Sequence, residues 1–195
     1  MSVLSDWLET RVPRLRASLG EPLTDEELAE SEALVGRPLP ADYVAFLREH
    51  DGQRFVPGER EGVGTLASVF SAFEILAASY CRGEWRSMRE WGAGTGNIVA
   101  DGPVRPLYQH EAWWPFTVIH GSSWNHCIDL DPAPGGDVGQ VILVSMKDSR
   151  RTVIASSFQD FMERLVAILE ESPVEVDEER GIELDDEALG WLLGG

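Results

Sequence analysis

Residues 114–146 have the sequence WPFTVIHGSSWNHCIDLDPAPGGDVGQVILVSM, and this stretch decides the fold class. Its apolar residues fall into three runs bounded by turn-forming residues, as is typical of β-strands, over 114–120, 126–130 and 140–146. The connections over 121–125 and 131–137 are too short to contain a crossover helix. The three strands should therefore pair in an antiparallel meander, because parallel neighbours need a longer connection.

Downstream of this stretch, the sequence predicts one more short strand and a long amphipathic helix. The strand is expected over 151–155, after a turn over 147–150. The helix begins after Ser157 as N-cap and carries apolar residues at spacings of three and four, namely Phe158, Phe161, Met162, Leu165, Val166, Ile168 and Leu169. Pro173 ends this helix, which should cover one face of the sheet.

Upstream of the stretch, helix signals dominate. An apolar stripe from Leu4 to Leu19 predicts a helix that is kinked or split at Pro13. Thr24 and Glu27 form a capping box that starts a second helix. That helix stops at Gly36, and a third runs from Pro40 to the turn at Asp51-Gly52.

The segment between these helices and the strands is less regular. Residues 53–68 are rich in glycine and polar residues and are predicted to form a loop. A fourth helix is predicted from Ser71 to about Glu90, and glycine and proline limit 99–110 to a short, edge-like strand. Helices, then a mainly antiparallel sheet, then a covering C-terminal helix predict an α+β fold.

Length and charge limit the organisation and the partners. A formal net charge of -18 over 195 residues should repel nucleic acid and anionic membranes and attract basic partners. We expect one domain over residues 1–171 and an acidic extension over 172–195, whose apolar residues predict partial docking. Without a signal peptide or a membrane-length apolar run, the chain is expected to be cytoplasmic.

Motifs for catalysis are missing from the sequence: it contains no GxSxG, HExxH or CxxC. His120, His126 and Cys127 lie across one predicted hairpin, and they are compatible with a zinc site or with a half-buried polar patch. Their spacing matches no standard structural zinc pattern, so the polar patch is favoured. We predict no enzyme activity, no catalytic residue, no cofactor and no bound metal.

Candidate partner-binding residues lie in and around the hairpin turns. Trp124 lies in a polar turn, where it either anchors a partner or folds back onto the sheet, and both alternatives stand. Together with Trp124, we predict a partner-binding surface that contains Asn125, Asp131, Asp137 and Trp113. Ordinary turn chemistry is favoured over a calcium site in the aspartate-containing loop, because the EF-hand spacing is absent.

The order of several motifs resembles one known group of proteins. The opening segment is Gly36-Arg-Pro-Leu-Pro40-Ala-Asp-Tyr43-Val-Ala-Phe46-Leu47, followed by Asp51-Gly52. Further along come Trp114-Pro-Phe, Asn125-x-x-Ile128-Asp129-Leu130-x-Pro132, Gly139-Gln140-Val141-Ile142 and Ala155-Ser-Ser157-Phe158 with Phe161 and Leu165. In this order and spacing, over about residues 24–170, they resemble the Smi/Knr-type (SUKH) superfamily.

The resemblance implies an α+β fold with a mainly antiparallel central sheet, and it implies no common catalytic set. Bacterial members are typically immunity proteins against polymorphic toxins, including nucleases, whereas fungal relatives are scaffolds linked to cell-wall regulation. The first prediction is therefore a non-enzymatic immunity protein that occludes the active site of a basic toxin. A regulatory or scaffolding module is the alternative, and a metal-dependent enzyme is a third.

Overall fold

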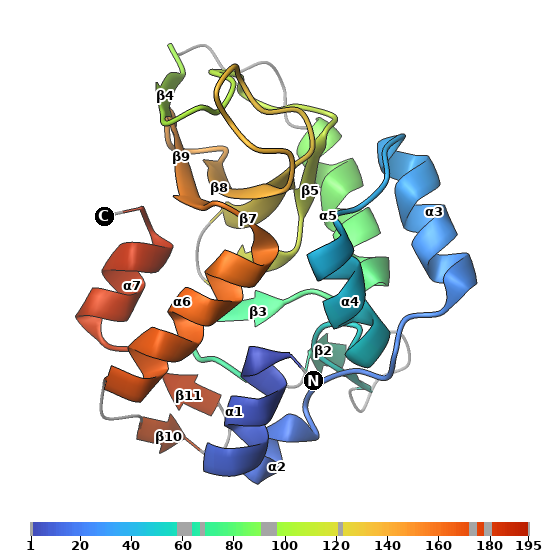
Figure 1. Ribbon diagram of the computed structural model, residues 1–195, viewed down its shortest axis with the longest axis vertical. Coiled ribbons are helices and arrows are strands. Elements are labelled where there is room, and N and C mark those ends of the chain that lie inside the picture. The colour runs from blue at the N-terminus through green and yellow to red at the C-terminus, as the bar shows by residue number, and fades with distance from the viewer. Residues whose placement is uncertain are drawn as a thin grey trace.

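The computed structural model describes residues 2–57, 64–66, 69–90, 97–120, 123–171, 175–177 and 181–194. Figure 1 shows a twisted sheet at one end of the molecule, with most of the helices gathered below and beside it. The sheet has five strands in the order β4 (Val99–Asp101), β9 (Arg150–Ala155), β8 (Gln140–Ser145), β7 (Trp124–Asp129) and β5 (Trp113–Pro115). Only β4 and β9 pair in parallel within this sheet, so the predicted α+β fold with a mainly antiparallel sheet is confirmed.

The predicted antiparallel pairing of the central hairpin is confirmed, but its first strand begins at Trp124 instead of His126, so Trp124 and Asn125 lie in a strand and not in the predicted turn. Strands β7 and β8 pair in register from Trp124 opposite Ser145 to Asp129 opposite Gln140. All six residues of β8 are buried, because both faces of the sheet are covered. Alternate residues point to opposite faces, so Val141 and Leu143 join the main hydrophobic cluster while the intervening Ile142 joins a smaller one.

Helix α6 (Phe158–Glu171) covers one face of the sheet, as predicted, and contacts β8 and β9. Its Phe158 and Phe161 pack edge-on against Phe116, with ring centroids 5.3 Å apart in both pairs. Tyr43 of helix α4 (Ala41–Glu49) packs against Phe158 at 4.9 Å. This aromatic cluster joins the N-terminal helices, the sheet and α6 into one core.

The prediction of one strand over 114–120 is wrong, because the run divides between two sheets. Strand β5 pairs with β7, whereas β6 (Thr117–Ile119) pairs with β3 (Phe73–Ile75). The chain changes sheets at Phe116, whose amide donates to the His126 carbonyl (3.0 Å) and whose carbonyl accepts from the Leu76 amide (2.8 Å). Both backbone groups of this buried residue are therefore satisfied across the break.

Two further element predictions are corrected by short strands. The helix predicted from Ser71 begins only at Ala78, as α5 (Ala78–Glu90), because Phe73 and Ile75 alternate with a less buried residue as strand β3. The loop predicted over 53–68 contains the antiparallel pair β1 (Phe55–Pro57) and β2 (Gly64–Leu66). Residues 58–63 and 67–68 of that prediction lie outside the described residues.

The N-terminal helices follow the sequence signals. Pro13 divides the first stripe into α1 (Val3–Arg11) and α2 (Pro13–Arg16). Helix α3 (Asp25–Val35) has the predicted capping box, in which Thr24 Oγ1 accepts from the Glu27 amide and Glu27 Oε2 accepts from the Thr24 amide. Gly36 ends α3 in the left-handed region, at φ 72°.

Replacing Thr24 with alanine should lower the free energy of unfolding by about 1 kcal/mol, because the α3 amide loses its capping oxygen. Urea unfolding of both proteins would measure the change. Thr10→Ala is the matched control, since the exposed Thr10 hydroxyl only bonds back to the Asp6 carbonyl of its own helix. Equal losses in the two variants would show that the cap makes no specific contribution.

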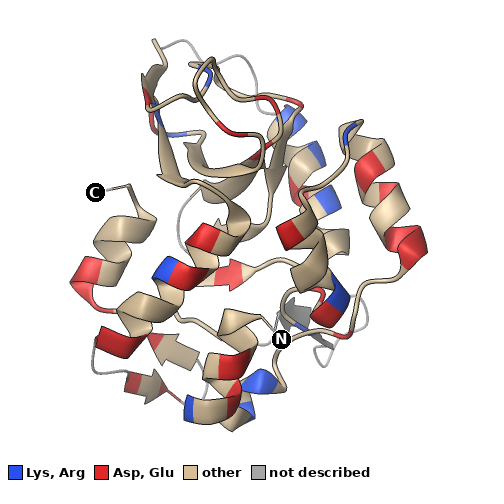
Figure 2. Cartoon of the chain, viewed as in Figure 1, with Lys and Arg blue, Asp and Glu red and all other residues tan. Residues whose placement is uncertain are grey.

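The described part of residues 172–195 is folded onto the rest of the chain. It forms the pair β10 (Glu175–Asp177) and β11 (Gly181–Glu183), followed by helix α7 (Asp186–Leu192). Ile182 bridges to Phe70, and both Ile182 and Leu192 lie in the main hydrophobic cluster. Buried apolar residues are thus combined with acidic residues in this segment, which Figure 2 shows on α7 and its neighbours.

Candidate interaction surface

Two of the five predicted partner-binding residues are interior. Trp113 in β5 is fully buried in the smaller hydrophobic cluster. Asn125 in β7 is 1% exposed, and its side-chain amide donates to Glu84 Oε1 and to the Thr117 carbonyl, both at 3.1 Å. A partner cannot reach either side chain in this arrangement. The two residues therefore pack beneath the predicted partner-binding surface and do not form part of it.

The other three predicted residues are more accessible. Trp124 is half-buried and packs against the main hydrophobic cluster, which is the folded-back arrangement rather than a free turn. Asp131 is half-buried and Asp137 is exposed, both in the connection between β7 and β8. The neighbouring Val138 is 69% exposed, so this loop presents an apolar side chain beside the acidic one. Binding by these residues stays a prediction.

Asp131 is the centre of a network of charged side chains. Its two carboxylate oxygens accept from His110 Nε2 (2.9 Å) and Arg105 Nη2 (3.1 Å), and Arg37 Nη2 lies at 3.8 Å. The hydrogen bonds from His110 and Arg105 hold the pKa of Asp131 below its ordinary value. The charge of Asp131 is therefore already balanced within the chain, which reduces what it offers to a basic partner.

The alternative zinc site is not assembled. His126 Nε2 lies 2.8 Å from the Leu192 carbonyl and Nδ1 lies 2.8 Å from Thr117 Oγ1, so both ring nitrogens are occupied. Cys127 points to the opposite face of β7, and burial raises its pKa. His120 bonds to the Ser71 carbonyl and Glu74 instead. Within the described residues, His, Cys, Asp and Glu side chains form no cluster of three that suits a metal.

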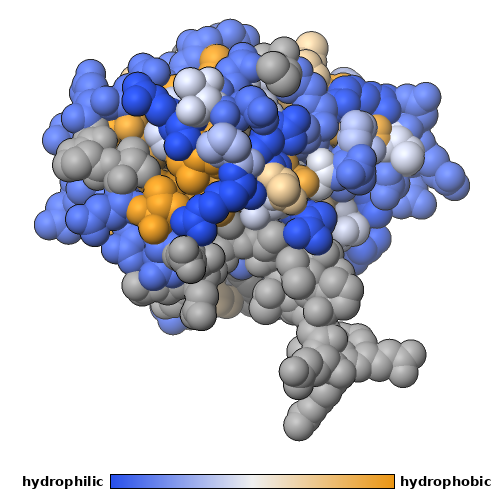
Figure 3. All heavy atoms as spheres, turned by 90° about the horizontal axis from the view of Figure 1, so that it is seen from below, coloured by the Kyte–Doolittle hydropathy of each residue, from blue (hydrophilic) through white to orange (hydrophobic). Residues whose placement is uncertain are grey.

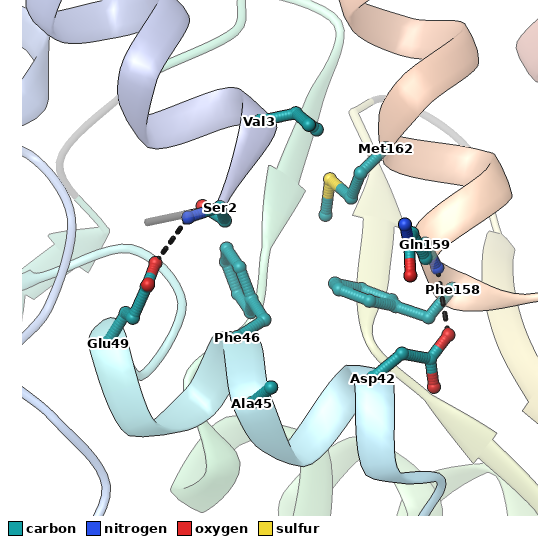
Figure 4. Close-up of a pocket in the computed structure, with 9 residues that line it drawn as sticks. All are labelled: Ser2, Val3, Asp42, Ala45, Phe46, Glu49, Phe158, Gln159 and Met162. Atoms are coloured by element: carbon teal, nitrogen blue, oxygen red, sulfur yellow. Dashed lines mark hydrogen bonds between the residues drawn. The ribbon is translucent and has the colours of Figure 1, made fainter.

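A pocket opens where helices α1, α4 and α6 meet (Figure 4). Its volume is about 250 Å³, and its lining residues are Ser2, Val3, Asp42, Ala45, Phe46, Glu49, Phe158, Gln159 and Met162. Figure 4 shows the rings of Phe46 and Phe158 and the thioether of Met162 directed into this space. These three residues are otherwise buried in the core, so the pocket has an apolar floor.

Hydrogen bonds at the rim hold the three helices in position. The Ser2 amide, at the start of α1, donates to Glu49 Oε2 at the end of α4 (2.5 Å). The Gln159 amide, in the first turn of α6, donates to Asp42 Oδ2 in the first turn of α4 (2.9 Å). Both carboxylates therefore lie at fixed places on the rim, on either side of the apolar floor.

A second hollow continues along the seam between α1 and α6. It has a volume of about 470 Å³ and is lined by Val3, Asp6, Trp7, Thr10, Arg11, Val166 and Glu170. Val3 lines both hollows and is 37% exposed. We call the two hollows together the α1–α6 groove.

Charge is unevenly distributed around the molecule. Figure 2 shows acidic residues along α1, α3, α6 and α7, and basic residues on α5 and near α2. The part of the surface that is coloured in the view from below is mostly hydrophilic, with small hydrophobic patches between hydrophilic residues (Figure 3). Among the described residues that line the groove, the carboxylates of Asp42, Asp6 and Glu170 outnumber the one arginine, Arg11, while the Glu49 carboxylate already accepts from the Ser2 amide. The groove thus combines an apolar floor, with Val3 exposed at its mouth, and negative charge along its rim.

Reasoning from sequence missed this groove. Phe46 and Phe158 were correctly placed on the apolar faces of their helices, but a helical pattern does not show where a face is left incompletely covered. The groove also depends on α1 meeting α6, from opposite ends of the chain. A useful signal was Val3, an apolar residue at the start of α1 that lies outside the apolar stripe from Leu4 to Leu19.

Fold and groove together define an α+β domain that presents an acidic, apolar-floored groove between helices. The chain belongs to the SMI1 / KNR4 family (SUKH-1), which it matches over residues 22–164. The resemblance to the SUKH superfamily is therefore confirmed, and the matched region contains α3, α4, the whole five-stranded sheet and the first half of α6.

The chain is similar to several curated fungal proteins. It is 33% identical to the "Cell wall biosynthesis/cell cycle regulator smi1" of Schizosaccharomyces pombe, over 96% of this chain and 38% of the relative. It is 25% identical to "KNR4/SMI1 homolog 2" of Debaryomyces hansenii, over 98% of this chain and 37% of the relative. It is 22% identical to the "Cell wall assembly regulator SMI1" of Saccharomyces cerevisiae, over 80% of this chain and 37% of the relative. The chain thus spans little more than a third of these relatives.

Among the described residues, no helix is both long enough and apolar enough to cross a membrane.

Proposed function

We propose that this chain is a non-enzymatic regulatory module that acts by binding another protein. The observation that carries the proposal is its similarity, over 96% of its length, to a fungal protein named as a regulator of cell-wall biosynthesis and the cell cycle. The α1–α6 groove supports it, because an open groove with an apolar floor in its first hollow and charged side chains along its rim has the composition of a protein-binding site.

Two of the groups whose pKa is raised by burial have contacts that support the proposal that the chain is not an enzyme. Burial raises the pKa of Asp51 to about 6, but its Oδ1 accepts from the Ala78 amide (2.7 Å) at the start of α5. Burial raises the pKa of the Cys81 thiol, which makes it a poor nucleophile, and it contacts Tyr43 and the Leu76 carbonyl. Each of these groups has a structural partner that accounts for its position.

Immunity against a toxin is the second candidate function. The net charge of -18 favours it, since this charge would speed association with a basic toxin. The names of the fungal relatives favour the regulatory alternative instead, and we therefore place regulation first. Both candidates require a tight complex with one protein, and they differ in what that protein does.

Affinity capture of the tagged chain from its own host tests the proposal. We expect one protein to be captured repeatedly, to capture the chain in the reciprocal experiment, and to form a defined complex when both are purified. Co-expression with that protein separates the candidates, because rescue of growth from a toxic partner indicates immunity. If the purified chain forms no complex with any of the proteins tested in the reciprocal experiment, the binding role would be contradicted.

A further inference from the structure

We propose that the α1–α6 groove binds a segment of a partner protein in which lysine or arginine residues stand beside apolar side chains. This inference rests on the proposed function and assigns it a surface and a class of partner. Its two requirements, an apolar side chain and a positive charge, come from two independent features of the groove.

The apolar requirement follows from the floor of the groove. Phe46, Phe158 and Met162 direct apolar atoms into the first hollow, and Trp7 and Val166 line the second. The first hollow, at about 250 Å³, is smaller than the roughly 300–1,000 Å³ of typical ligand pockets. The first hollow therefore suits one inserted side chain, and the second hollow, at about 470 Å³, has room for neighbouring residues of the same segment.

The charge requirement follows from the rim. Asp42 accepts hydrogen bonds from the backbone amides of Tyr43 and Gln159, which carry no charge, so these bonds leave its negative charge in place. Asp6 and Glu170 are exposed beside the second hollow. A cationic group that lies along the rim would meet carboxylates at both hollows, while the stem of lysine or arginine lies on the apolar floor.

The same charges disfavour the other occupants of an apolar groove. A second copy of this chain would also carry a net charge of -18 and would be repelled. An anionic membrane surface would be repelled for the same reason. The α5 helix, with Arg82, Arg86 and Arg89, is less suited to a cationic segment. The α1–α6 groove therefore combines the apolar and acidic features that this partner needs.

Two short peptides test the inference, one of alternating lysine and leucine and one with serine in place of leucine. Each is titrated into the isotopically labelled full chain and followed by nuclear magnetic resonance. We expect the lysine–leucine peptide to shift resonances of α1, α4 and α6 and to bind at least about tenfold more tightly, as burial of one apolar side chain predicts. Equal affinities, or shifts confined to other elements, would overturn the proposal.

Two arginine variants make the test specific to the groove. Ala45→Arg places a bulky cation on the exposed rim of the first hollow, and it should weaken lysine–leucine peptide binding about tenfold or more. Ala29→Arg makes the same change on the exposed face of α3, and it should leave affinity nearly unchanged. Equal losses would show that only overall charge matters, and no loss with Ala45→Arg would place binding elsewhere.

The outcome is distinguishable from a failure of the proposed function. If Ala45→Arg still forms the reciprocal complex with a host protein at full affinity, the regulatory role stands and the groove is not its surface. If no host protein forms a reciprocal complex with either the original chain or Ala29→Arg, the proposed function itself fails.

Discussion

Replacing Phe116 with alanine should lower the free energy of unfolding by about 3–5 kcal/mol, the largest loss we expect from a single core substitution. Phe116 is fully buried and contacts the rings of Tyr43, Phe158, Phe161 and His126. Those residues come from α4, α6 and β7, so a cavity at this point removes contacts between several elements at once.

Urea unfolding monitored by circular dichroism measures this loss. Phe116→Leu should lose clearly less, because leucine refills part of the cavity. Val138→Ala is a surface control and should change stability by no more than about 0.5 kcal/mol, since Val138 is 69% exposed. If Phe116→Ala loses no more than Val138→Ala, the aromatic cluster is not the centre of the core.

Acidification should destabilise the chain through His126, with an effect of about 3 kcal/mol between neutral pH and pH 4. The ring is buried among Phe73, Phe116 and Phe161, and burial lowers the pKa of His126 to about 4. The unfolded chain binds this proton near pH 6.5 but the folded chain only near pH 4. The stability is therefore fully present above about pH 6.5 and is lost as the pH falls toward 4.

The matched variant for this prediction is His126→Gln, which can still donate to the Leu192 carbonyl and accept from Thr117. Unfolding at a series of pH values should show the original chain losing stability relative to this variant as the pH falls. Asp51 acts in the opposite direction, because its raised pKa of about 6 favours the folded, protonated form at acid pH. Comparing His126 and His126→Gln in chains that both carry Asp51→Asn removes the contribution of Asp51 to the pH dependence. Parallel pH curves would contradict the buried position of His126.

The sequence predicts those elements whose signals are local. The capping box of α3, the split at Pro13 and the antiparallel pairing of β7 with β8 each depend on residues that are close in sequence, and all three form as predicted. The run over 114–120 was misassigned because both of its parts have a strand-like composition, and the break at Phe116 is set by separate partners, β7 and β3. Pairing with a distant strand leaves no mark in the local pattern.

The candidate site was harder to predict for the same reason. Trp113 and Asn125 lie beside turns in the sequence, yet both faces of the sheet are covered at β5 and β7, and this coverage places both residues in the interior. Asp131 meets Arg37, Arg105 and His110 only through tertiary contacts, so the balance of its charge cannot be predicted from neighbouring residues in the sequence. The α1–α6 groove likewise exists only after the two ends of the chain meet.

Hydrogen–deuterium exchange of the chain, alone and in the reconstituted complex with its reciprocally captured partner, tests the central claim most directly. The claim is that this family member acts by binding a protein through the α1–α6 groove. We predict slower exchange in the complex for α1, α4 and α6, with little change in the connection between β7 and β8. Protection confined to that connection, around Asp131 and Asp137, would contradict the account and place the binding surface at the hairpin turns instead.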